Sequence, residues 1–248
     1  MTLDVVFTPR DLVPGEVAGR TVFVIDILRA TTSMITALAN GARGIVPAAT
    51  PDEAVRLARS LGDDAMLAGE RNCERIPGFA LGNSPADMTA AAVAGRLVVM
   101  GTTNGTAAML AAHGAAEVYA AAAVNLTVAA ARAREAVEDG RGLLLLCAGR
   151  AGGFGLDDAY TAGRLLHAAV GDRRSVRGLN DAAVASLDLV RRYGSDFRRP
   201  LRRSGAGRQL LAQGHADDLA AAAAVDAWPV LPRFGDGMLT TPAVVTAA

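Results

Sequence analysis

Residues 21–41, TVFVIDILRATTSMITALANG, decide the fold of this chain. Residues 22–25 are an unbroken β-branched and aromatic run, which is typical of a strand buried on both faces of a parallel sheet. Apolar residues then recur at helical spacing, which predicts that the strand turns directly into a helix. Asp26, Arg29, Thr31 and Thr32 would share that corner, where open α/β sheets bind ligands and a helix N-terminus favours anions. A helix cap with an Asp–Arg surface pair is the alternative explanation.

The composition excludes several classes of function. A chain of 248 residues with 51% hydrophobic residues can bury a large core, and its 25 basic and 25 acidic residues cancel, which argues against a groove for nucleic acid. There is no lysine, so Schiff-base chemistry and a P-loop lysine are excluded. Two cysteines, no signal-peptide pattern and short apolar runs indicate a cytoplasmic protein without a membrane partner. A homodimer is an option that no sequence pattern decides.

Short apolar strands alternate with helical segments along most of the chain. Strands are predicted at residues 3–7, 22–25, 44–47, 65–68, 96–100, 116–121 and 143–146, and helices at 51–61, 107–113, 125–137, 159–170, 181–193 and 208–213. Residues 69–85 and 198–208 are predicted to be irregular loops. We therefore expect one domain over residues 1–248: a three-layer α/β fold with a mainly parallel sheet and helices on both faces, with two lobes around a cleft as an option.

Four of the predicted strands run into polar or glycine-rich corners, at residues 26–32, 69–84, 102–106 and 147–158. The carboxyl ends of parallel strands open on one edge of a sheet, so we expect these corners to converge. Carboxylates without histidine or thiolate partners suit a hard cation such as Mg²⁺, and arginine and hydroxyl groups suit an oxyanion. The sequence therefore predicts metal-assisted phosphate chemistry. The alternative explanation of residues 102–106 is a capped tight turn. The alternative explanation of Asp157 and Asp158 is that they interact only with a helix dipole.

Other phosphatase signatures do not match. A haloacid-dehalogenase-type site needs a second Asp two residues after the first, where Leu28 follows Asp26. A cysteine-based phosphatase loop needs Arg six residues after its nucleophile, where Gly153 follows Cys147. The histidines have no zinc spacing, and no dinucleotide fingerprint follows the first strands.

Five segments resemble the 2-phosphosulfolactate phosphatase family, the ComB-like proteins, and occur in the order of that family. They are VIDILRATTSMITALANGA (24–42), GERNCERIPGFALGNSP (69–85), TTNGT (102–106), CAGRAGGFGLDDAYTAG (147–163) and SGAGRQLLAQGHADDL (204–219). The resemblance implies the family's own α/β fold, Mg²⁺ dependence and hydrolysis of a phosphate monoester on a small acidic carbon skeleton. In the family's best-known role the products are sulfolactate and phosphate.

The strand-end argument and the resemblance together give the candidate site. We expect the catalytic residues Asp26, Arg29, Glu70 and Asp158 and the Mg²⁺ ligands Asp26, Glu70, Asp157 and Asp158, directly or through water. The expected substrate cradle is Arg29, Thr31, Thr32, Asn83, Ser84, Thr103, Asn104, Gly105 and Thr106, with Arg71 able to meet a carboxylate or sulfonate. The attacking group is open between a metal-activated water and Asp26.

A non-catalytic binder of a phosphorylated or sulfonated metabolite is the second hypothesis. Its motivation is Ala80, where the family usually has Asp, and a loop that reads Asn72-Cys73-Glu74 instead of a glycine-rich sequence. Gly101 and Asp157 also differ, since the family usually has Thr and Glu there.

Overall fold

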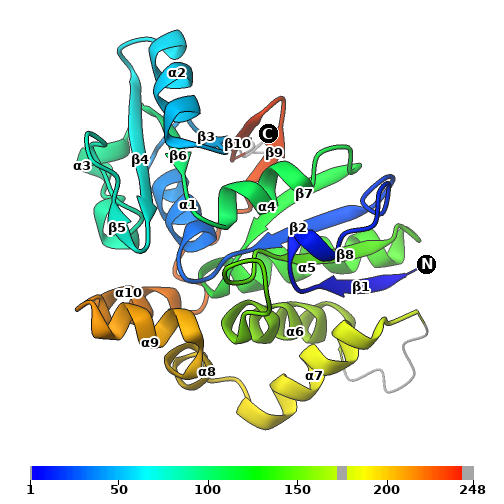
Figure 1. The fold of residues 1–248 in the computed structure, drawn as a ribbon. Coiled ribbons are helices and arrows are strands. Elements are labelled where there is room, and N and C mark those ends of the chain that lie inside the picture. The colour runs from blue at the N-terminus through cyan, green and yellow to red at the C-terminus, as the bar shows by residue number, and fades with distance from the viewer. Residues whose placement is uncertain (1, 172–177, 242–248) are drawn as a thin grey trace, which may run out of the picture.

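The computed structural model describes residues 2–171 and 178–241, and its ten-stranded sheet contains two groups of parallel strands joined by a hairpin (Figure 1). The first group, in spatial order, is β1 (Leu3–Val6), β8 (Leu143–Cys147), β2 (Thr21–Ile25) and β7 (Glu117–Ala121). The second is β3 (Gly44–Ala48), β6 (Leu97–Gly101) and β4 (Ala65–Arg71), with the short antiparallel β5 (Glu74–Arg75) at its edge. The predicted mainly parallel α/β sheet is confirmed.

The hairpin that joins the groups comes from the end of the described chain. Strand β9 (Arg233–Gly235) pairs antiparallel with β7, and β10 (Met238–Thr240) pairs antiparallel with β3. The two groups therefore do not share one strand direction along the sheet, contrary to the single parallel sheet edge assumed from the sequence. Their carboxyl ends nevertheless meet, because the groups face each other across a middle layer of helices (Figure 1).

That middle layer consists of α1 (Ala30–Ala39) and α4 (Gly105–Ala111). Helix α1 contacts β7 and β3, and α4 contacts β2 and β3, so both helices pack on both groups of strands. Helices α5 (Leu126–Glu138) and α6 (Leu156–Val170) pack on the first group, and α7 (Asp181–Tyr193) packs on α6. Figure 1 shows α6 and α7 on the side away from α4, which confirms the prediction of helices on both faces.

The remaining helices lie outside the middle layer of α1 and α4. Helix α2 (Pro51–Leu61) packs on β3, β4 and β6, and α3 (Ala90–Val93) is a single turn before β6. Helices α8 (Arg198–Arg203), α9 (Gly205–Ala212) and α10 (Ala216–Ala222) follow α7. Short 3-10 turns occur at η1 (Pro9–Asp11), η2 (Pro85–Asp87) and η3 (Ala123–Asn125). No helix in the described ranges is both long and apolar enough to cross a membrane.

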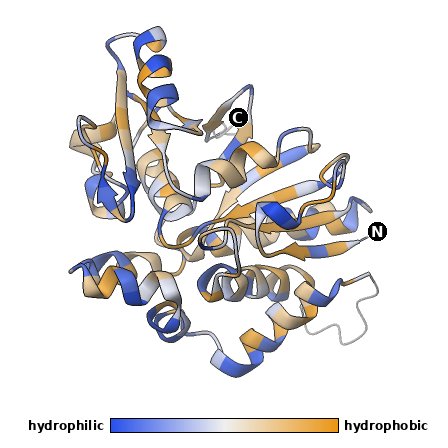
Figure 2. Cartoon of the chain, in the orientation of Figure 1, coloured by the Kyte–Doolittle hydropathy of each residue, from blue (hydrophilic) through white to orange (hydrophobic). Residues whose placement is uncertain are grey.

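Burial explains why the opening stretch behaves as predicted. Every residue of β2 and of β8 is buried, and Figure 2 shows hydrophobic residues along these central strands. Ile25 pairs with Cys147 on one side and with Ala121 on the other, so β2, β7 and β8 end level with one another. Asp26 therefore leaves the sheet at a fixed height beside the ends of its neighbours.

Two predicted loops contain regular structure that the sequence did not predict, although residues 76–84 are irregular as expected. Residues 69–85 include the end of β4 and a tight hairpin to β5, because Asn72 and Cys73 adopt φ values of 57° and 68°, as a primed two-residue turn requires. Residues 198–208 form α8 and the start of α9, because Leu201 is fully buried among arginines that looked like a solvated run. The sequence also gave no prediction of α10, β9 or β10.

Candidate active site

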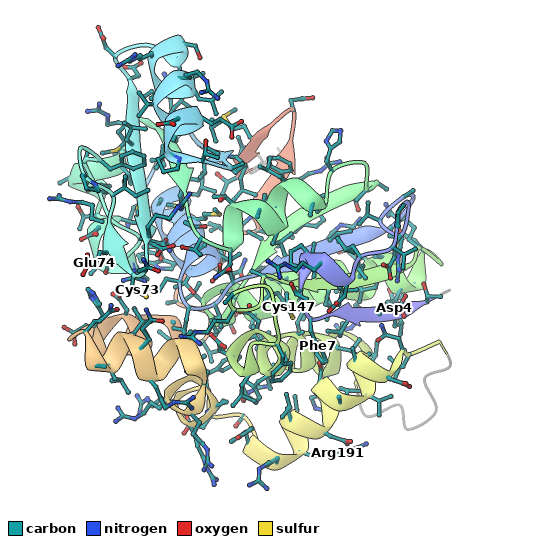
Figure 3. All side chains as sticks on the ribbon, in the orientation of Figure 1. Asp4, Phe7, Cys73, Glu74, Cys147 and Arg191 are labelled. Carbon is teal, nitrogen blue, oxygen red and sulfur yellow. The ribbon has the colours of Figure 1, made fainter. Side chains whose placement is uncertain are left out.

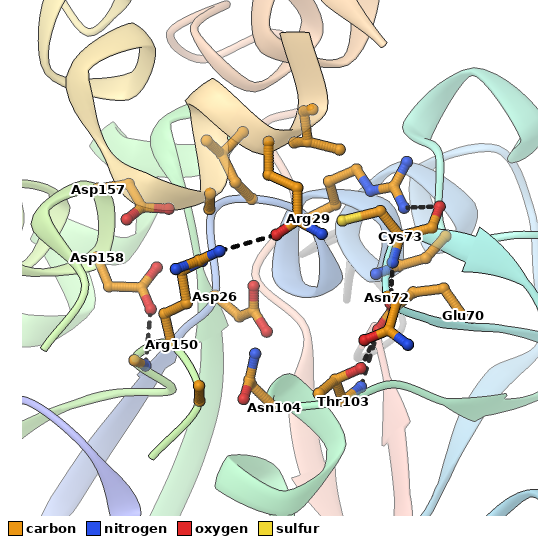
Figure 4. A pocket seen from close by; sticks show the side chains of 17 residues that line it. Asp26, Arg29, Glu70, Asn72, Cys73, Thr103, Asn104, Arg150, Asp157 and Asp158 are labelled. Carbon is orange, nitrogen blue, oxygen red and sulfur yellow. Dashed lines mark hydrogen bonds between the residues drawn. The ribbon is translucent and has the colours of Figure 1, made fainter. Parts of the chain in front are cut away.

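A cavity of about 200 Å³ opens where the strand ends of the two groups meet (Figure 4). Strand β2 contributes Asp26, β4 contributes Glu70, and the loops after β6 and β8 contribute Thr103 and Gly149. The predicted convergence of the four corners is therefore observed. The residues that line the cavity are Asp26, Leu28, Arg29, Glu70, Asn72, Cys73, Asn83, Thr103, Asn104, Gly149, Arg150, Ala151, Asp157, Asp158, Ala206, Gln209 and Leu210.

Asp26 is a buried carboxylate with little hydrogen-bond support. Its Oδ1 accepts one long bond, 3.4 Å, from the backbone N–H of Ala30. Burial and the nearby carboxylates of Asp157 and Glu70 raise its pKa to about 7, although the Ala30 N–H and Arg29 oppose the shift. A Cβ atom at Gly105 would lie 2.7 Å from Asp26 Oδ2, so the glycine leaves the space that this carboxylate occupies.

Asp157 is the second carboxylate with a strongly perturbed pKa. Helix α6 begins at Leu156, so Asp157 and Asp158 lie in its first turn and not before it as predicted. Burial raises the pKa of Asp157 to about 6, against the opposing effects of two backbone N–H groups, Arg150 and Ser204. The charge of Asp157 in turn favours protonation of Asp26, since two buried like charges repel.

Asp158 has a different environment, because both of its oxygens accept backbone hydrogen bonds. Oδ1 accepts from Ile27 N–H at 3.0 Å and Oδ2 from Gly149 N–H at 3.0 Å. The carboxylate thus ties the corner after β2 to the corner after β8. Its pKa is raised well above the ordinary value by burial and by the charges of Asp157 and Asp26.

Glu70 holds the opposite wall together in a similar way. Its Oε1 accepts from the backbone N–H and the hydroxyl of Thr103, at 2.8 and 2.9 Å, and its Oε2 accepts from Cys73 N–H at 2.8 Å. Three donors therefore occupy this carboxylate before any ligand binds. The bonds fix the β4–β5 hairpin, whose tip carries Cys73 and Glu74 toward α9 and α10 (Figure 3), against the loop after β6.

The carboxylate that pairs with Arg29 is Asp218 on α10, and not Asp26. Arg29 Nη1 donates to Asp218 Oδ2 at 2.6 Å, and Nη2 donates to the carbonyl oxygen of Cys73 at 3.0 Å. Asp218 Oδ1 accepts from Ser84 Oγ at 2.5 Å. Both charged side chains are only 4% exposed, so this is a buried ion pair that joins the cavity wall to a distant helix.

The predicted cradle residues fall into two sets. Asn83, Thr103 and Asn104 line the cavity, and Asn83 Oδ1 is buried without a hydrogen-bond partner. The hydroxyls of Thr31, Thr32 and Thr106 instead donate to backbone carbonyl groups, at 3.0, 2.8 and 3.2 Å, and help to fix the strand-to-helix corners. Ser84, Gly105 and Arg71 are not among the lining residues; Arg71 Nη1 donates to the carbonyl oxygen of Glu70.

Sequence reasoning missed several residues of the site. Arg150 lies within residues 147–163, but no role was predicted for it. Gln209 and Asp218 lie within residues 204–219, which contributed only to the family resemblance. Cys73 also lines the cavity; it and Cys147 are both free thiols. The glycines around Arg150 are the signal that could have indicated a loop close to a ligand.

No three His, Cys, Asp or Glu side chains within residues 2–171 and 178–241 converge closely enough to hold a metal ion without other ligands. The cavity carboxylates are therefore spread around its wall (Figure 4). A cation at this site would take water or substrate oxygens in addition to protein ligands, as Mg²⁺ ordinarily does.

The fold and site define the class of α/β protein that binds a small molecule at converging strand ends, with perturbed carboxylates in the cavity. The family model described as 2-phosphosulpholactate phosphatase matches residues 6–237. A probable 2-phosphosulfolactate phosphatase from Symbiobacterium thermophilum is 40% identical over 90% of this chain and 95% of its own. One from Deinococcus radiodurans is 40% identical over 92% of each chain, and one from Caldanaerobacter subterraneus is 32% identical over 91% and 92%. The chain belongs to the 2-phosphosulfolactate phosphatase family.

Proposed function

We propose that this protein is a Mg²⁺-dependent phosphatase that hydrolyses a phosphate monoester of a small acidic metabolite, with 2-phosphosulfolactate as the substrate. The family and the names of its relatives support the reaction and the substrate. The observation that carries the chemistry is Asp26, a buried carboxylate with a pKa of about 7 that lines the cavity beside Arg29. In the metal-free protein this pKa lets the carboxyl group gain or lose a proton near neutral pH, and a bound cation would hold it in the ionised form.

The donor set of the cavity fits Mg²⁺. Burial raises the pKa values of Asp26, Asp157 and Asp158, repulsion from Asp157 adds to the shifts of Asp26 and Asp158, and a divalent cation would supply the counter-charge that these buried carboxylates lack. Glu70 and Asp158 have both oxygens occupied by donors from the protein. We therefore assign Asp26 and Asp157 as direct ligands, and Glu70 and Asp158 as residues that shape the site. When bound, the ion would neutralise charge on the phosphoryl oxygens.

The protein's own groups would do the rest of the work. Asn83 and Asn104 would orient the phosphate, since each lines the cavity and its side-chain amide carries N–H donors, whereas the donors of Thr103 are bonded to Glu70. Phosphoryl transfer depends mainly on such positioning and on electrostatic stabilisation. Asp26 Oδ2 lies against Gly105 and either takes a proton from the attacking water or attacks phosphorus itself. Both routes need Asp26 to be ionised.

The binder hypothesis loses part of its motivation in the structure. Ala80 is exposed and is not among the lining residues, so a carboxylate missing there leaves the cavity intact. The altered loop forms the β4–β5 turn, whose Cys73 N–H still bonds Glu70. We retain the binder as the outcome that the following experiment would reveal.

A panel of esters tests the proposed substrate class. Inorganic phosphate release is measured with Mg²⁺ for 2-phosphosulfolactate, 2-phospholactate and 4-nitrophenyl phosphate. We expect the two acidic esters to be hydrolysed with the higher kcat/KM. Release from none of them, together with tight calorimetric binding of a phosphorylated acid, would replace the enzyme by the binder.

A further inference from the structure

Arg150 is held at the cavity by a small turn in the loop between β8 and α6. Its backbone N–H donates to the carbonyl oxygen of Gly153 at 2.9 Å, and Gly153 N–H donates back at 3.0 Å. Ala151 and Gly152 between them adopt φ values of 52° and 74°. The turn fixes the position of Arg150, although the side chain itself is exposed toward solvent.

The side chain of Arg150 reaches across to helix α9. Its Nη2 donates to Gln209 Oε1 at 2.9 Å, and both residues line the cavity, in which Figure 4 shows Arg150. A Cβ atom at Gly205 would lie 3.2 Å from Arg150 Nη1 and 3.3 Å from its Cδ, so the first turn of α9 leaves room for the guanidinium. Ala206 in the same turn also lines the cavity.

The two guanidinium groups that line the cavity differ in their charge balance. Arg29 is neutralised by the buried carboxylate of Asp218 at 2.6 Å. Arg150 has only the neutral Gln209 as a side-chain acceptor, and within the described part of the chain no carboxylate comes within ion-pair distance of it. Of the two, Arg150 is therefore the guanidinium without a carboxylate in direct contact, although its charge also acts on the nearby Asp157.

We propose that Arg150, beside the first turn of α9, forms the subsite for the second acidic group of the substrate, a carboxylate or sulfonate separate from the phosphate. This inference rests on the proposed function and makes Arg150 a specificity-determining residue. Asp26 and Asp157 are buried in the cavity wall, where the phosphate would lie, and Arg150 lines the same cavity with its side chain exposed to solvent. In 2-phospholactate the carboxylate is on the carbon that carries the phosphate ester, and 2-phosphosulfolactate has in addition a sulfonate on the neighbouring carbon, so each ester presents an acidic group a few bonds from its phosphate.

The subsite would work by exchange of hydrogen-bond partners. The incoming acid takes the place of Gln209 Oε1 on the guanidinium, and a charge-assisted, bidentate bond replaces a neutral one. An arginine suits planar recognition of a carboxylate better than lysine does. The cation also offsets the negative charge that an anionic substrate meets from the carboxylates on the cavity wall.

The test compares two esters that differ in the acidic group alone: 2-phospholactate, and isopropyl phosphate, in which a methyl group replaces the carboxylate. In Arg150→Ala and Arg150→Gln we expect KM for 2-phospholactate to rise about tenfold to a hundredfold, as loss of a charge-assisted bond implies. The ratio of the two KM values should rise by the same factor. Arg191→Ala on the surface of α7 is the matched control and should leave the ratio as in wild type.

Equal increases of KM for both esters would overturn the subsite, because Arg150 would then act on the phosphate or on folding. If wild-type protein hydrolyses neither of these esters nor 2-phosphosulfolactate, the proposed function fails separately. Calorimetry with sulfolactate, which has no phosphate, then decides the subsite. Weaker binding to Arg150→Ala than to Arg191→Ala supports it, and equal binding rejects it.

Discussion

Replacing Asp26 with asparagine is expected to stop phosphate release and, in the absence of metal, to make the protein more stable at pH 8. Loss of a proton-transfer group lowers kcat by about 10²- to 10⁴-fold. The pKa of Asp26 is about 7 in the folded protein, compared with the ordinary value of 3.8 expected in the unfolded chain. The folded state therefore binds this proton more tightly than the unfolded state does. The free energy of unfolding therefore falls as pH rises from 3.8 to 7, and Asp26→Asn removes that cost, roughly 4 kcal/mol at pH 8.

Urea unfolding in EDTA at pH 5 and pH 8 measures this effect. The free energy of unfolding of Asp26→Asn should exceed that of wild type at pH 8. The difference should be smaller at pH 5, where Asp26 is protonated in the folded wild type. Asp188→Asn on the surface of α7 is the control and should change neither stability nor phosphate release. If Asp26→Asn is less stable than wild type at pH 8, this carboxylate is not the strained group that the site requires.

Replacing Asp218 with asparagine should give the largest loss of stability of any change near the site. Arg29 is 4% exposed and would keep its charge without a counter-charge, which costs about 3 to 5 kcal/mol. For a chain of this length the melting temperature should fall by roughly 6 to 20 °C. Differential scanning calorimetry of the metal-free protein measures the shift.

A double variant separates the two roles of this ion pair. Arg29→Met with Asp218→Leu removes both charges and should recover most of the lost stability, because a well-packed apolar pair replaces a buried ion pair at little cost. If Arg29 also contacts the phosphate, inorganic phosphate should still bind the double variant more weakly than wild type. Equal phosphate affinity would leave Arg29 as a structural residue. If wild type and Asp218→Asn are equally stable, the Arg29–Asp218 ion pair does not stabilise the fold.

The sequence predicted where the cavity carboxylates lie, because they follow strands whose burial is visible as unbroken apolar runs. Asp26 after β2 and Asp157 and Asp158 after β8 could be placed at one edge from that pattern alone. The four corners converge as predicted, but they do not lie at one edge of a single parallel sheet. The hairpin of β9 and β10 separates the two groups of parallel strands.

The partners of these residues could not be predicted, since they are set by packing between segments far apart in the chain. Arg29 meets Asp218 across 189 positions, and Arg150 meets Gln209 across 59. No local pattern encodes such pairs. The helices that bring Asp218 and Gln209 to the cavity lie next to an arginine-rich segment, whose charge concealed the buried Leu201.

The most direct test of the central claim is phosphate release from 2-phosphosulfolactate by protein stripped of metal with EDTA, measured before and after Mg²⁺ is restored. The account predicts no release from the stripped protein, and recovery that follows the Mg²⁺ concentration and is absent in Asp26→Asn. Equal release with and without Mg²⁺, or release by Asp26→Asn at the wild-type rate, would contradict it.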